Sequence, residues 1–312
     1  MPRYAFSTQQ RHGFPRIRRL LAPLLLLTAM VSCTSGGETR SRNCPVGEVQ
    51  FGVDPFENAA RLIPAYKPLA RQLGDRLGCP VELHIPTSYS AEVEAMRQGK
   101  LDVAQFGPLG YAFAERLARA RVVATYGDSR GRPLTYRTLI VTPSSSGITR
   151  LTECRGRSFA YSDAVSTSGR LFPAYALKRA GIDPDRGVKP RYAGSHTASY
   201  EALRQGKADC GALPTPQIEI AKDAGIYKPG ELRTLWRSAP IPHEAVTVRE
   251  TLPAPFRERV REELLALDLT KIPEEHRGLL FGPRLVAQQE TAYDEVRALA
   301  RKMGLDVKDL DG

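Results

Sequence analysis

The chain has 312 residues, of which 42% are hydrophobic and 25% are charged, and its formal net charge is +11. This length exceeds the usual size of one compact domain, and the composition suffices to bury a large core, so two lobes are expected. Residues 1–32 hold five arginines and no acid, and their removal lowers the charge to +6. The remaining basic residues are scattered among acids, with no stripe of lysine and arginine interleaved with aromatics, which argues against nucleic-acid binding. A moderate positive surplus suits attraction of an anionic ligand.

The N-terminal residues predict export. Five arginines precede an apolar run from Leu20 to Val31, which is too short to span a bilayer and is typical of a signal peptide. The end of the run, Ala29-Met30-Val31-Ser32-Cys33, resembles a bacterial lipoprotein signal, which implies lipidation of Cys33. We therefore expect a signal peptide over 1–32 and a polar tether over 33–45. The body of the protein would then lie in the periplasm or be lipid-anchored to the outer face of the cytoplasmic membrane.

Four further cysteines remain, and export makes disulfide bonds permissible among them. Cys44 and Cys79 each precede a predicted strand, while Cys154 and Cys210 flank the two strand candidates of a later unit. Four cysteines allow three connectivities, and we predict Cys44–Cys79 and Cys154–Cys210, one in each lobe. Free buried thiols are the alternative.

The first part of the chain alternates strands with helices. Gly78 ends the first long helix, and Pro108 suits the first turn of a later one. Such alternation implies a mainly parallel sheet covered on both faces. Strands are expected at Glu48–Val53, Val81–Ile85, Leu101–Phe106, Val122–Tyr126 and Leu134–Val141, and helices at Asn58–Leu77, Ser90–Gln98 and Gly107–Leu117.

A polar stretch, Thr142–Gly147, marks a composition break before a second alternating unit. Its strands are expected at Ser158–Tyr161, Val188–Ala193, Asp209–Leu213 and Leu232–Trp236, and its helices at Leu171–Gly181, from Thr197, and after Pro216. A strand at Ala245–Arg249 then returns to the first lobe, with helices near Phe256–Leu265 and at Ala292–Met303. Lobe one is therefore expected to comprise 46–142 and 246–312, and lobe two 143–245, with two crossings between them.

An internal repeat at an offset of 107 residues relates the two units. Glu94–Asp102 lies over Glu201–Asp209, and seven of the nine pairs are identical. Tyr89 then overlies His196, and the Gly107-Pro108 turn overlies Pro214-Thr215. Two related α/β lobes with two connections form a cleft, and ligands of open α/β sheets bind at the carboxyl ends of strands. The repeat therefore predicts that these positions face the cleft.

A hydroxyl-rich turn, Ser166-Thr167-Ser168-Gly169, lies between a predicted strand and a predicted helix. Three hydroxyls beside the free N–H groups of a helix N-terminus provide the donors that a small oxyanion needs. The alternative is that Ser166 or Thr167 merely caps the helix.

These features together resemble the substrate-binding components of phosphate, phosphite and phosphonate ABC transporters. The resemblance runs from about Val49 to Pro253, and it depends on the order and spacing of several motifs. They are Ser88-Tyr89, Asp102–Tyr111, Ser166–Gly169, Gly194-Ser195-His196 and Ile241-Pro242. The resemblance implies the two-lobed periplasmic-binding fold of type II, with mixed, mainly parallel sheets flanked by helices.

The resemblance also implies a set of ligand-binding residues and partners. The head group of the oxyanion would be held by Tyr89, Ser166, Thr167, Ser168 and His196, and an aromatic, Tyr111 or Phe106, would line the cleft. Members that bind aminoalkyl phosphonates present carboxylates to the amine, and here Glu244 alone remains as a candidate, which argues against an amine-bearing ligand. The partner would be an ABC permease, and the protein would act as a monomer without metal or cofactor. Core packing for Tyr111 and helix capping for His196 remain as alternatives.

Two other functions are alternatives. Ser168 with His196 suggests a phosphoester hydrolase, but neither residue lies in a G-x-S-x-G motif, and the sequence has no H-E-x-x-H motif and no Walker loop. The five histidines, His12, His84, His196, His243 and His276, show no metal-ligand spacing. The second alternative keeps the fold and the ligand but couples the protein to a sensor kinase.

Overall fold

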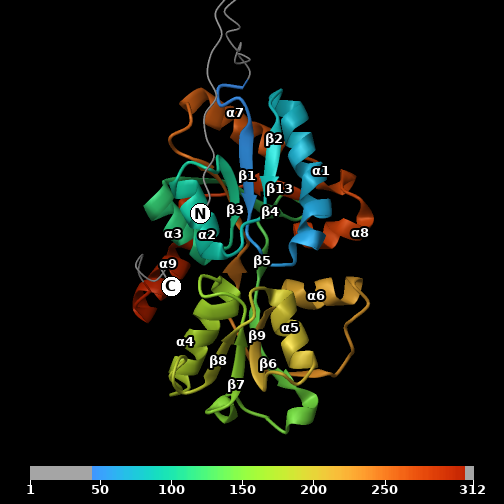
Figure 1. Ribbon diagram of the computed structural model, residues 1–312, viewed down its shortest axis with the longest axis vertical. Helices are drawn as coiled ribbons and strands as arrows, with labels where there is room; N and C mark the ends of the chain where they lie inside the picture. Colours follow the sequence, from blue (N-terminus) through green and yellow to red (C-terminus); the bar gives the residue numbers. More distant parts are fainter. Residues whose placement is uncertain (1–43, 306–312) are drawn as a thin grey trace, which may run out of the picture. The chain divides into compact units, whose positions relative to one another are not determined.

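The computed structural model describes residues 44–305, which belong to one compact unit (Figure 1). The predicted signal peptide, Cys33 and the tether up to residue 43 lie outside the described residues. Within the described range, two large sheets and one two-stranded sheet organise the chain. No helix in this range is long and apolar enough to cross a membrane.

The first sheet has six strands in the order β13-β4-β12-β3-β1-β2. Strand β1 pairs in parallel with both β2 and β3, while β12 runs antiparallel to both β3 and β4. The strands are β1 (Val49–Val53), β2 (Val81–His84), β3 (Val103–Phe106), β4 (Ala120–Gly127), β12 (Ala245–Arg249) and β13 (Arg284–Ala287). Strand β13, which pairs antiparallel with β4, was not predicted.

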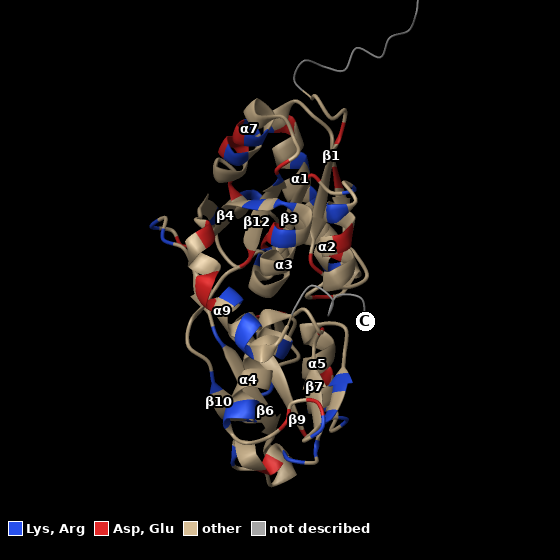
Figure 2. Cartoon of the chain, turned by 90° about the vertical axis from the view of Figure 1, so that its left-hand side faces the viewer, with Lys and Arg blue, Asp and Glu red and all other residues tan. Residues whose placement is uncertain are grey.

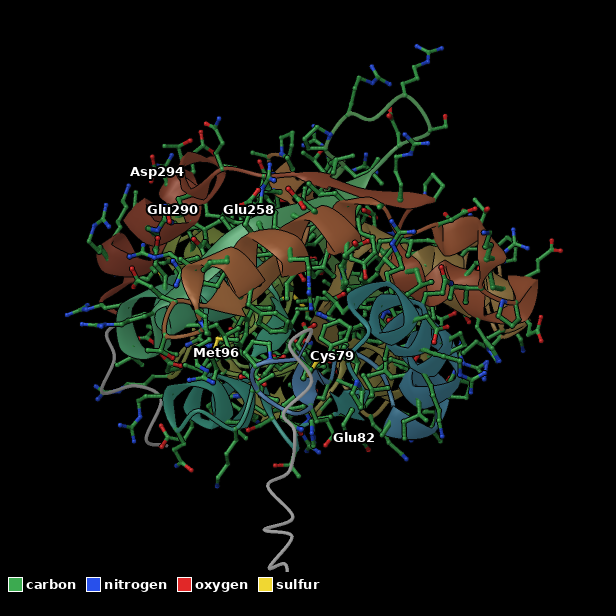
Figure 3. All side chains as sticks on the ribbon, turned by 90° about the horizontal axis from the view of Figure 1, so that it is seen from above. Cys79, Glu82, Met96, Glu258, Glu290 and Asp294 are labelled. Atoms are coloured by element: carbon green, nitrogen blue, oxygen red, sulfur yellow. A yellow bond between two sulfur atoms is a disulfide. The ribbon has the colours of Figure 1, made fainter. Side chains whose placement is uncertain are left out.

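Helices cover both faces of this sheet (Figure 1). One group packs α1 (Ala59–Leu77) with α7 (Ala254–Leu265) and α8 (Glu274–Arg277). The other packs α3 (Pro108–Ala118) with α2 (Tyr89–Arg97) and α9 (Asp294–Met303). Seen from above, Cys79 and Met96 lie inside lobe one, whereas the labelled acids Glu82, Glu258, Glu290 and Asp294 are exposed (Figure 3).

The second sheet has five strands in the order β10-β6-β9-β7-β8. Its strands are β6 (Thr138–Pro143), β7 (Ser158–Tyr161), β8 (Lys189–Tyr192), β9 (Cys210–Pro214) and β10 (Leu232–Arg237). Its helices are the π-helix η3 (Thr167–Leu171), which continues into α4 (Phe172–Arg179), then α5 (His196–Arg204) and α6 (Thr215–Asp223). Single turns of 3₁₀-helix occur at η1 (Ser144–Ser146), η2 (Leu151–Cys154), η4 (Leu269–Lys271), η5 (Gly278–Leu280) and η6 (Glu290–Tyr293).

The two crossings between the lobes pair with each other. Strand β5 (Thr135–Tyr136) is antiparallel to β11 (Ile241–Pro242), and together they form the two-stranded sheet. The run Leu134–Val141, predicted as one strand of lobe one, is divided between β5 and β6, and β6 pairs with β9 and β10 of the second sheet. The expected boundary at residue 142 is therefore corrected to the β5–β6 junction. A uniform apolar run does not reveal which distant strands its two halves join.

The internal repeat corresponds to equivalent structures in the two lobes. Helices α2 and α5 each begin after a serine, Ser88 or Ser195, whose side chain accepts a hydrogen bond from the N–H three residues later. At the other end of the repeat, Asp102 accepts from the Gln50 N–H at 3.0 Å, and Asp209 accepts from the Ser158 N–H at 2.9 Å. The repeated aspartates thus fix the start of β1 and of β7.

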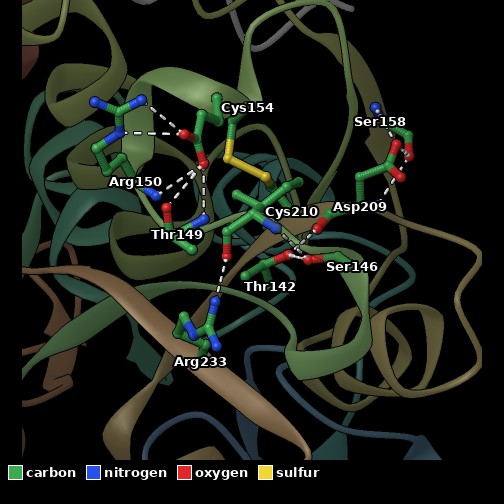
Figure 4. The surroundings of a disulfide bond; sticks show 11 residues. Thr142, Ser146, Thr149, Arg150, Cys154, Ser158, Asp209, Cys210 and Arg233 are labelled. Carbon is green, nitrogen blue, oxygen red and sulfur yellow. Dashed lines mark hydrogen bonds and ion pairs between the residues drawn. A yellow bond between two sulfur atoms is a disulfide. The ribbon is translucent and has the colours of Figure 1, made fainter.

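Both predicted disulfides are confirmed. Cys44 is bonded to Cys79 beside β1 and β2, and Cys154 is bonded to Cys210 at the start of β9. Around the second bond, Thr142 donates to the Asp209 carbonyl at 2.6 Å, and Arg233 reaches the Ile148 carbonyl (Figure 4). Each cross-link lies within one lobe and leaves the crossing strands free of covalent ties between lobes.

Candidate functional site

An enclosed cavity of about 20 Å³, here called the inner cavity, lies between the two lobes at the carboxyl ends of their strands. Residues of the first lobe and its crossings contribute Asp54, Phe56, Tyr89, Gly107, Tyr136, Glu244 and Phe281. Residues of the second lobe contribute Ser166, Thr167, Ser168, His196, Pro214, Pro216, Gln217 and Ile220. Six of the predicted ligand-binding residues therefore meet at one place: Tyr89, Ser166, Thr167, Ser168, His196 and Glu244.

The hydroxyl-rich turn is held by a close approach at its glycine. Ser166 is the N-cap of η3, and its Oγ accepts from the Gly169 N–H at 3.0 Å. A Cβ at Gly169 would lie 1.7 Å from Ser162 Oγ, so no other residue fits here without displacement. The capping interpretation of Ser166 is correct, and it coexists with the position of Ser166 in the cavity wall.

Thr167 joins the hydroxyl turn to the opposite lobe. Its Oγ1 accepts a hydrogen bond from the Leu109 N–H, 2.8 Å away, in the first turn of α3. Two more contacts cross the cleft: the His196 N–H donates to the Phe56 carbonyl at 3.1 Å, and the Thr197 hydroxyl donates to the Glu57 carboxylate. These bonds hold the lobes in a closed arrangement around the inner cavity.

Tyr89 and His196 present polar atoms that lack a partner. Tyr89 is 3% exposed and His196 is 7% exposed. Neither Tyr89 Oη nor His196 Nδ1 makes a hydrogen bond within the described protein, and the same holds for Gln217 Oε1. Buried polar groups without partners are costly, and such groups around a cavity indicate a polar ligand.

Burial sets the charge state of His196. It lowers the pKa of the imidazole from 6.5 to about 4, so the ring is neutral near pH 7. A neutral imidazole keeps one N–H donor and contributes no net charge. His196 is therefore suited to donate a hydrogen bond to an oxyanion.

Two carboxyl groups line the inner cavity, and one of them was not predicted. Glu244 is paired with His243, whose Nδ1 lies 2.6 Å from Glu244 Oε2. Asp54, which was not predicted, is 1% exposed, and burial together with the charge of Glu244 raises its pKa. Asp54 directly follows β1 at the carboxyl end of a parallel strand, and the rule that placed the other site residues there also applies to it.

The predicted aromatics Tyr111 and Phe106 are outside the inner cavity, and this prediction is corrected. Tyr111 packs edge-on against Tyr293, with ring centroids 4.9 Å apart, and its hydroxyl donates to Glu115. Phe106 lies under α3, 3.7 Å from where a side chain of Gly110 would begin. Both are core residues of lobe one because α3 packs over β3 and against α9.

Other aromatics take their place at the cavity wall. They are Phe56, Tyr136 and Phe281, and the rings of Phe56 and Phe281 lie 5.0 Å apart. Phe281 has a φ of 54°, a left-handed conformation that bulky residues rarely adopt. It also lines a second, open cavity of about 590 Å³ on the outer side. Phe281 is thus part of the partition between the inner and the outer cavity.

None of the described residues that line the inner cavity is a lysine or an arginine. Basic and acidic residues are instead interspersed on outer surfaces, for example along α7 (Figure 2). Any anion in the cavity would be held by hydroxyl, imidazole and backbone N–H groups. Among the described residues, no group of three or more His, Cys, Asp or Glu is placed to hold a metal ion.

Comparisons with known proteins agree with this geometry. Residues 51–295 match the family model described as "ABC transporter, phosphonate, periplasmic substrate-binding protein". The chain is 28% identical over 252 residues to the phosphate-import protein PhnD of Mycolicibacterium smegmatis, covering 78% of each chain. It is 24% identical over 230 residues to the phosphonates-binding periplasmic protein of Escherichia coli, covering 73% of this chain and 68% of that one.

A solved structure shows the same fold. PhnD1 of Prochlorococcus marinus, in complex with methylphosphonate, superposes with a TM-score of 0.73 at 21% identity. The superposition covers 83% of this chain and 99% of that chain. The two-lobed periplasmic-binding architecture expected from the sequence is therefore confirmed.

Proposed function

Because the chain belongs to the family of periplasmic substrate-binding proteins of phosphonate ABC transporters, we propose that its inner cavity captures a small phosphorus oxyanion for delivery to an ABC permease. The candidate ligands are phosphate, phosphite and small phosphonates. Relatives of the chain are described as a phosphate-import protein and a phosphonates-binding protein, which supports this class of ligand.

The observation that carries the proposal is the set of unpaired donors around one enclosed space. Tyr89 Oη and His196 Nδ1 are buried without partners, from opposite lobes, beside three hydroxyls of the Ser166–Ser168 turn. Hydrogen bonds to a charged partner contribute roughly 1.5–3 kcal/mol each. Four or five of them, less the costs of ordering and desolvation, reach the approximately 8 kcal/mol of a micromolar dissociation constant.

The same groups are arranged for binding and not for reaction. Ser166 Oγ accepts from the Gly169 N–H, and Thr167 Oγ1 accepts from the Leu109 N–H. His196 Nδ1 has no carboxylate to orient the ring, unlike the base of a hydrolytic triad. A hydroxyl that no base activates is a weak nucleophile. We therefore expect the protein to retain its ligand unchanged.

We further propose that Cys33 carries a lipid and that the protein functions as a monomer with one ligand per chain. The lipoprotein-like sequence ending at Cys33 supports the first part. Globomycin treatment, which blocks removal of lipoprotein signals, tests it in cells. Accumulation of the full-length precursor is expected, and unchanged processing in wild type and in a Cys33→Ser variant would contradict it.

A thermal-shift panel tests the ligand class. Phosphate, phosphite, methylphosphonate, sulfate and chloride would each be added to the protein after removal of any retained ligand. A ligand present at 100 times its dissociation constant stabilises the folded state by about 2.7 kcal/mol. At least one phosphorus oxyanion is expected to raise the melting temperature of the protein. In a separate turnover assay, a phosphate monoester should yield no hydrolysis product. Absence of stabilisation by every phosphorus oxyanion, or steady turnover of the ester, would overturn the proposal.

A further inference from the structure

Asp54 occupies an unusual place for a carboxyl group in an anion-binding protein. It is 1% exposed and lines the inner cavity. Its Oδ1 accepts a hydrogen bond from Gln105 Nε2 at 3.2 Å, and its backbone N–H donates to the Gln105 carbonyl. The side chain is therefore held in one orientation by β3.

The second carboxyl oxygen of Asp54, Oδ2, lies near the backbone of Gly107. A Cβ built on this glycine would lie 3.7 Å from Asp54 Oδ2, 3.8 Å from Tyr89 Cε1 and 3.9 Å from Thr167 Oγ1. These three groups come from different elements and from both lobes, yet they converge on one point that glycine leaves open. Asp54 Oδ2, the ring of Tyr89 and the hydroxyl of Thr167 thus border the same open point of the cavity wall.

Among the residues that the structure describes, no lysine or arginine lines the cavity to balance the charge of Asp54. Its charge interacts with two buried carboxyl groups, Glu92 on α2 and Glu244 ahead of β12, and with the half-buried Asp163 after β7. The other titratable groups around it are His196, which lines the same cavity, His243, which is paired with Glu244, and the buried tyrosines Tyr66, Tyr89, Tyr126 and Tyr136. Burial and the charge of Glu244 raise the pKa of Asp54, which makes its proton easier to keep.

An ionised Asp54 and a fully ionised oxyanion in the same cavity would repel each other, because none of the described residues that line the cavity is a lysine or an arginine. With one proton between them, the same two groups form a strong, charge-assisted hydrogen bond. Phosphate groups gain and lose their second proton near neutral pH. Sulfate and sulfonates carry no such proton there.

Resting on the function proposed above, we propose that Asp54 and the bound oxyanion share one proton, so that affinity depends on a proton that the ligand or Asp54 brings. The proton arrives on a monoprotonated ligand or is already on Asp54. When a fully ionised ligand meets an ionised Asp54, one proton is taken up from solvent. No other bond is made or broken. Phosphate, phosphite and phosphonates can bring the proton themselves, whereas sulfate and sulfonates depend on a protonated Asp54.

Calorimetric titration with the best phosphorus oxyanion of the panel, between pH 6.5 and pH 9.5, tests the shared proton. Wild type is expected to lose affinity at least tenfold across this range, because both groups become ionised. Asp54→Asn places an amide N–H where the proton was. The affinity of this variant should therefore change less than threefold between pH 6.5 and pH 9.5. Glu258→Gln removes an exposed carboxyl on α7 that does not line the cavity and should retain the wild-type profile. Identical profiles for wild type and Asp54→Asn would overturn the proposal, as would loss of the pH dependence in Glu258→Gln.

Two further ligands complete the test. Sulfate brings no proton and depends on a protonated Asp54, so its affinity for wild type should fall at least tenfold between pH 6.5 and pH 9.5, and its affinity for Asp54→Asn should change less than threefold over the same range. An aminoalkyl phosphonate that binds wild type more tightly than methylphosphonate, with the advantage lost in Asp54→Asn, would instead assign Asp54 to an ammonium group and overturn the proposal. If wild type binds no phosphorus oxyanion even at pH 6.5, the proposed function itself fails, which is a different result from binding that Asp54 does not influence.

Discussion

Tyr89 and His196 occupy the same position in two copies of one structural unit. Each is the first residue of a helix, α2 or α5, and each follows a serine N-cap. Each is buried, lines the inner cavity and has one polar side-chain atom without a partner. The two lobes therefore place equivalent residues on opposite sides of the cleft, with a phenolic hydroxyl on one side and an imidazole on the other.

Replacement of Tyr89 by phenylalanine should separate binding from stability. Because Tyr89 Oη has no partner in the protein, its removal should leave the free energy of unfolding unchanged or slightly higher. Loss of one hydrogen bond to an anion should weaken ligand binding about ten- to a hundredfold. Calorimetry and denaturant titration measure the two effects.

Tyr66→Phe is the matched control for that experiment. The Tyr66 hydroxyl donates to the Leu279 carbonyl at 3.1 Å and also contacts Gln105 and Tyr126. Its removal should lower stability by about 1–3 kcal/mol and leave affinity nearly unchanged. Reversed behaviour of the two variants would contradict the assignment of Tyr89 to the ligand.

His196→Ala should weaken binding of the phosphorus oxyanion at least tenfold, since it removes a neutral N–H donor of the cavity. The measurement is a calorimetric dissociation constant for each variant. His276→Ala, on α8 and away from the cavity, should bind like wild type. An unchanged dissociation constant for His196→Ala would refute the role of this side chain.

Stability should depend on pH through His196 in acid. The folded-state pKa of about 4 lies below the ordinary value of 6.5, so the unfolded chain binds the proton first as pH falls. The contribution of the neutral ring is complete above pH 6.5 and is lost on acidification toward pH 4, up to about 3 kcal/mol. Urea titrations of wild type and His196→Gln at pH 7 and pH 4.5 should show the smaller acid loss in the variant. An equal loss in both would show that the ring is not buried in its neutral form.

Gly169→Ala should disrupt the hydroxyl turn. The new methyl group would lie 1.7 Å from Ser162 Oγ and 2.7 Å from Ser162 Cβ, which forces a shift of the turn and destabilises by about 1–3 kcal/mol. Ser162→Gly removes both clashing atoms and should restore part of the stability and the ligand affinity.

Gly110→Ala serves as the control because its neighbours are at 3.7 Å, an ordinary contact distance, inside α3. Gly110→Ala should stabilise the folded protein slightly, by up to about 1 kcal/mol, because alanine favours a helix more than glycine does. If Gly169→Ala is as well tolerated as Gly110→Ala, the close packing of the turn against Ser162 is not required.

The features predicted correctly from sequence were those with a local or repeated signal. Helix α1 ends at Gly78 as expected, with this glycine in a left-handed conformation, and the repeat placed Tyr89 and His196 at equivalent helix starts. The Ser166–Gly169 turn was evident because hydroxyls, a glycine and a strand end coincide within a few residues.

The features that were missed or wrong depend on contacts between distant segments. Asp54 becomes a buried cavity residue only when β3 and the turn before β12, some 50 and 190 residues later, pack beside it. The family resemblance predicted that Tyr111 lines the cleft. In the structure α9 packs against α3, and Tyr111 is buried in the core of lobe one. The split of Leu134–Val141 likewise follows from pairing with β9, β10 and β11.

The most direct test of this account is a calorimetric titration of wild type and of the combined Tyr89→Phe/His196→Ala variant with phosphate, phosphite and methylphosphonate at pH 7. We expect saturable one-to-one binding of at least one of them to wild type at micromolar affinity or better, and a loss of at least a hundredfold in the variant. No binding by wild type, or equal affinity in a variant that remains folded, would contradict the assignment of the inner cavity as the site of a phosphorus oxyanion.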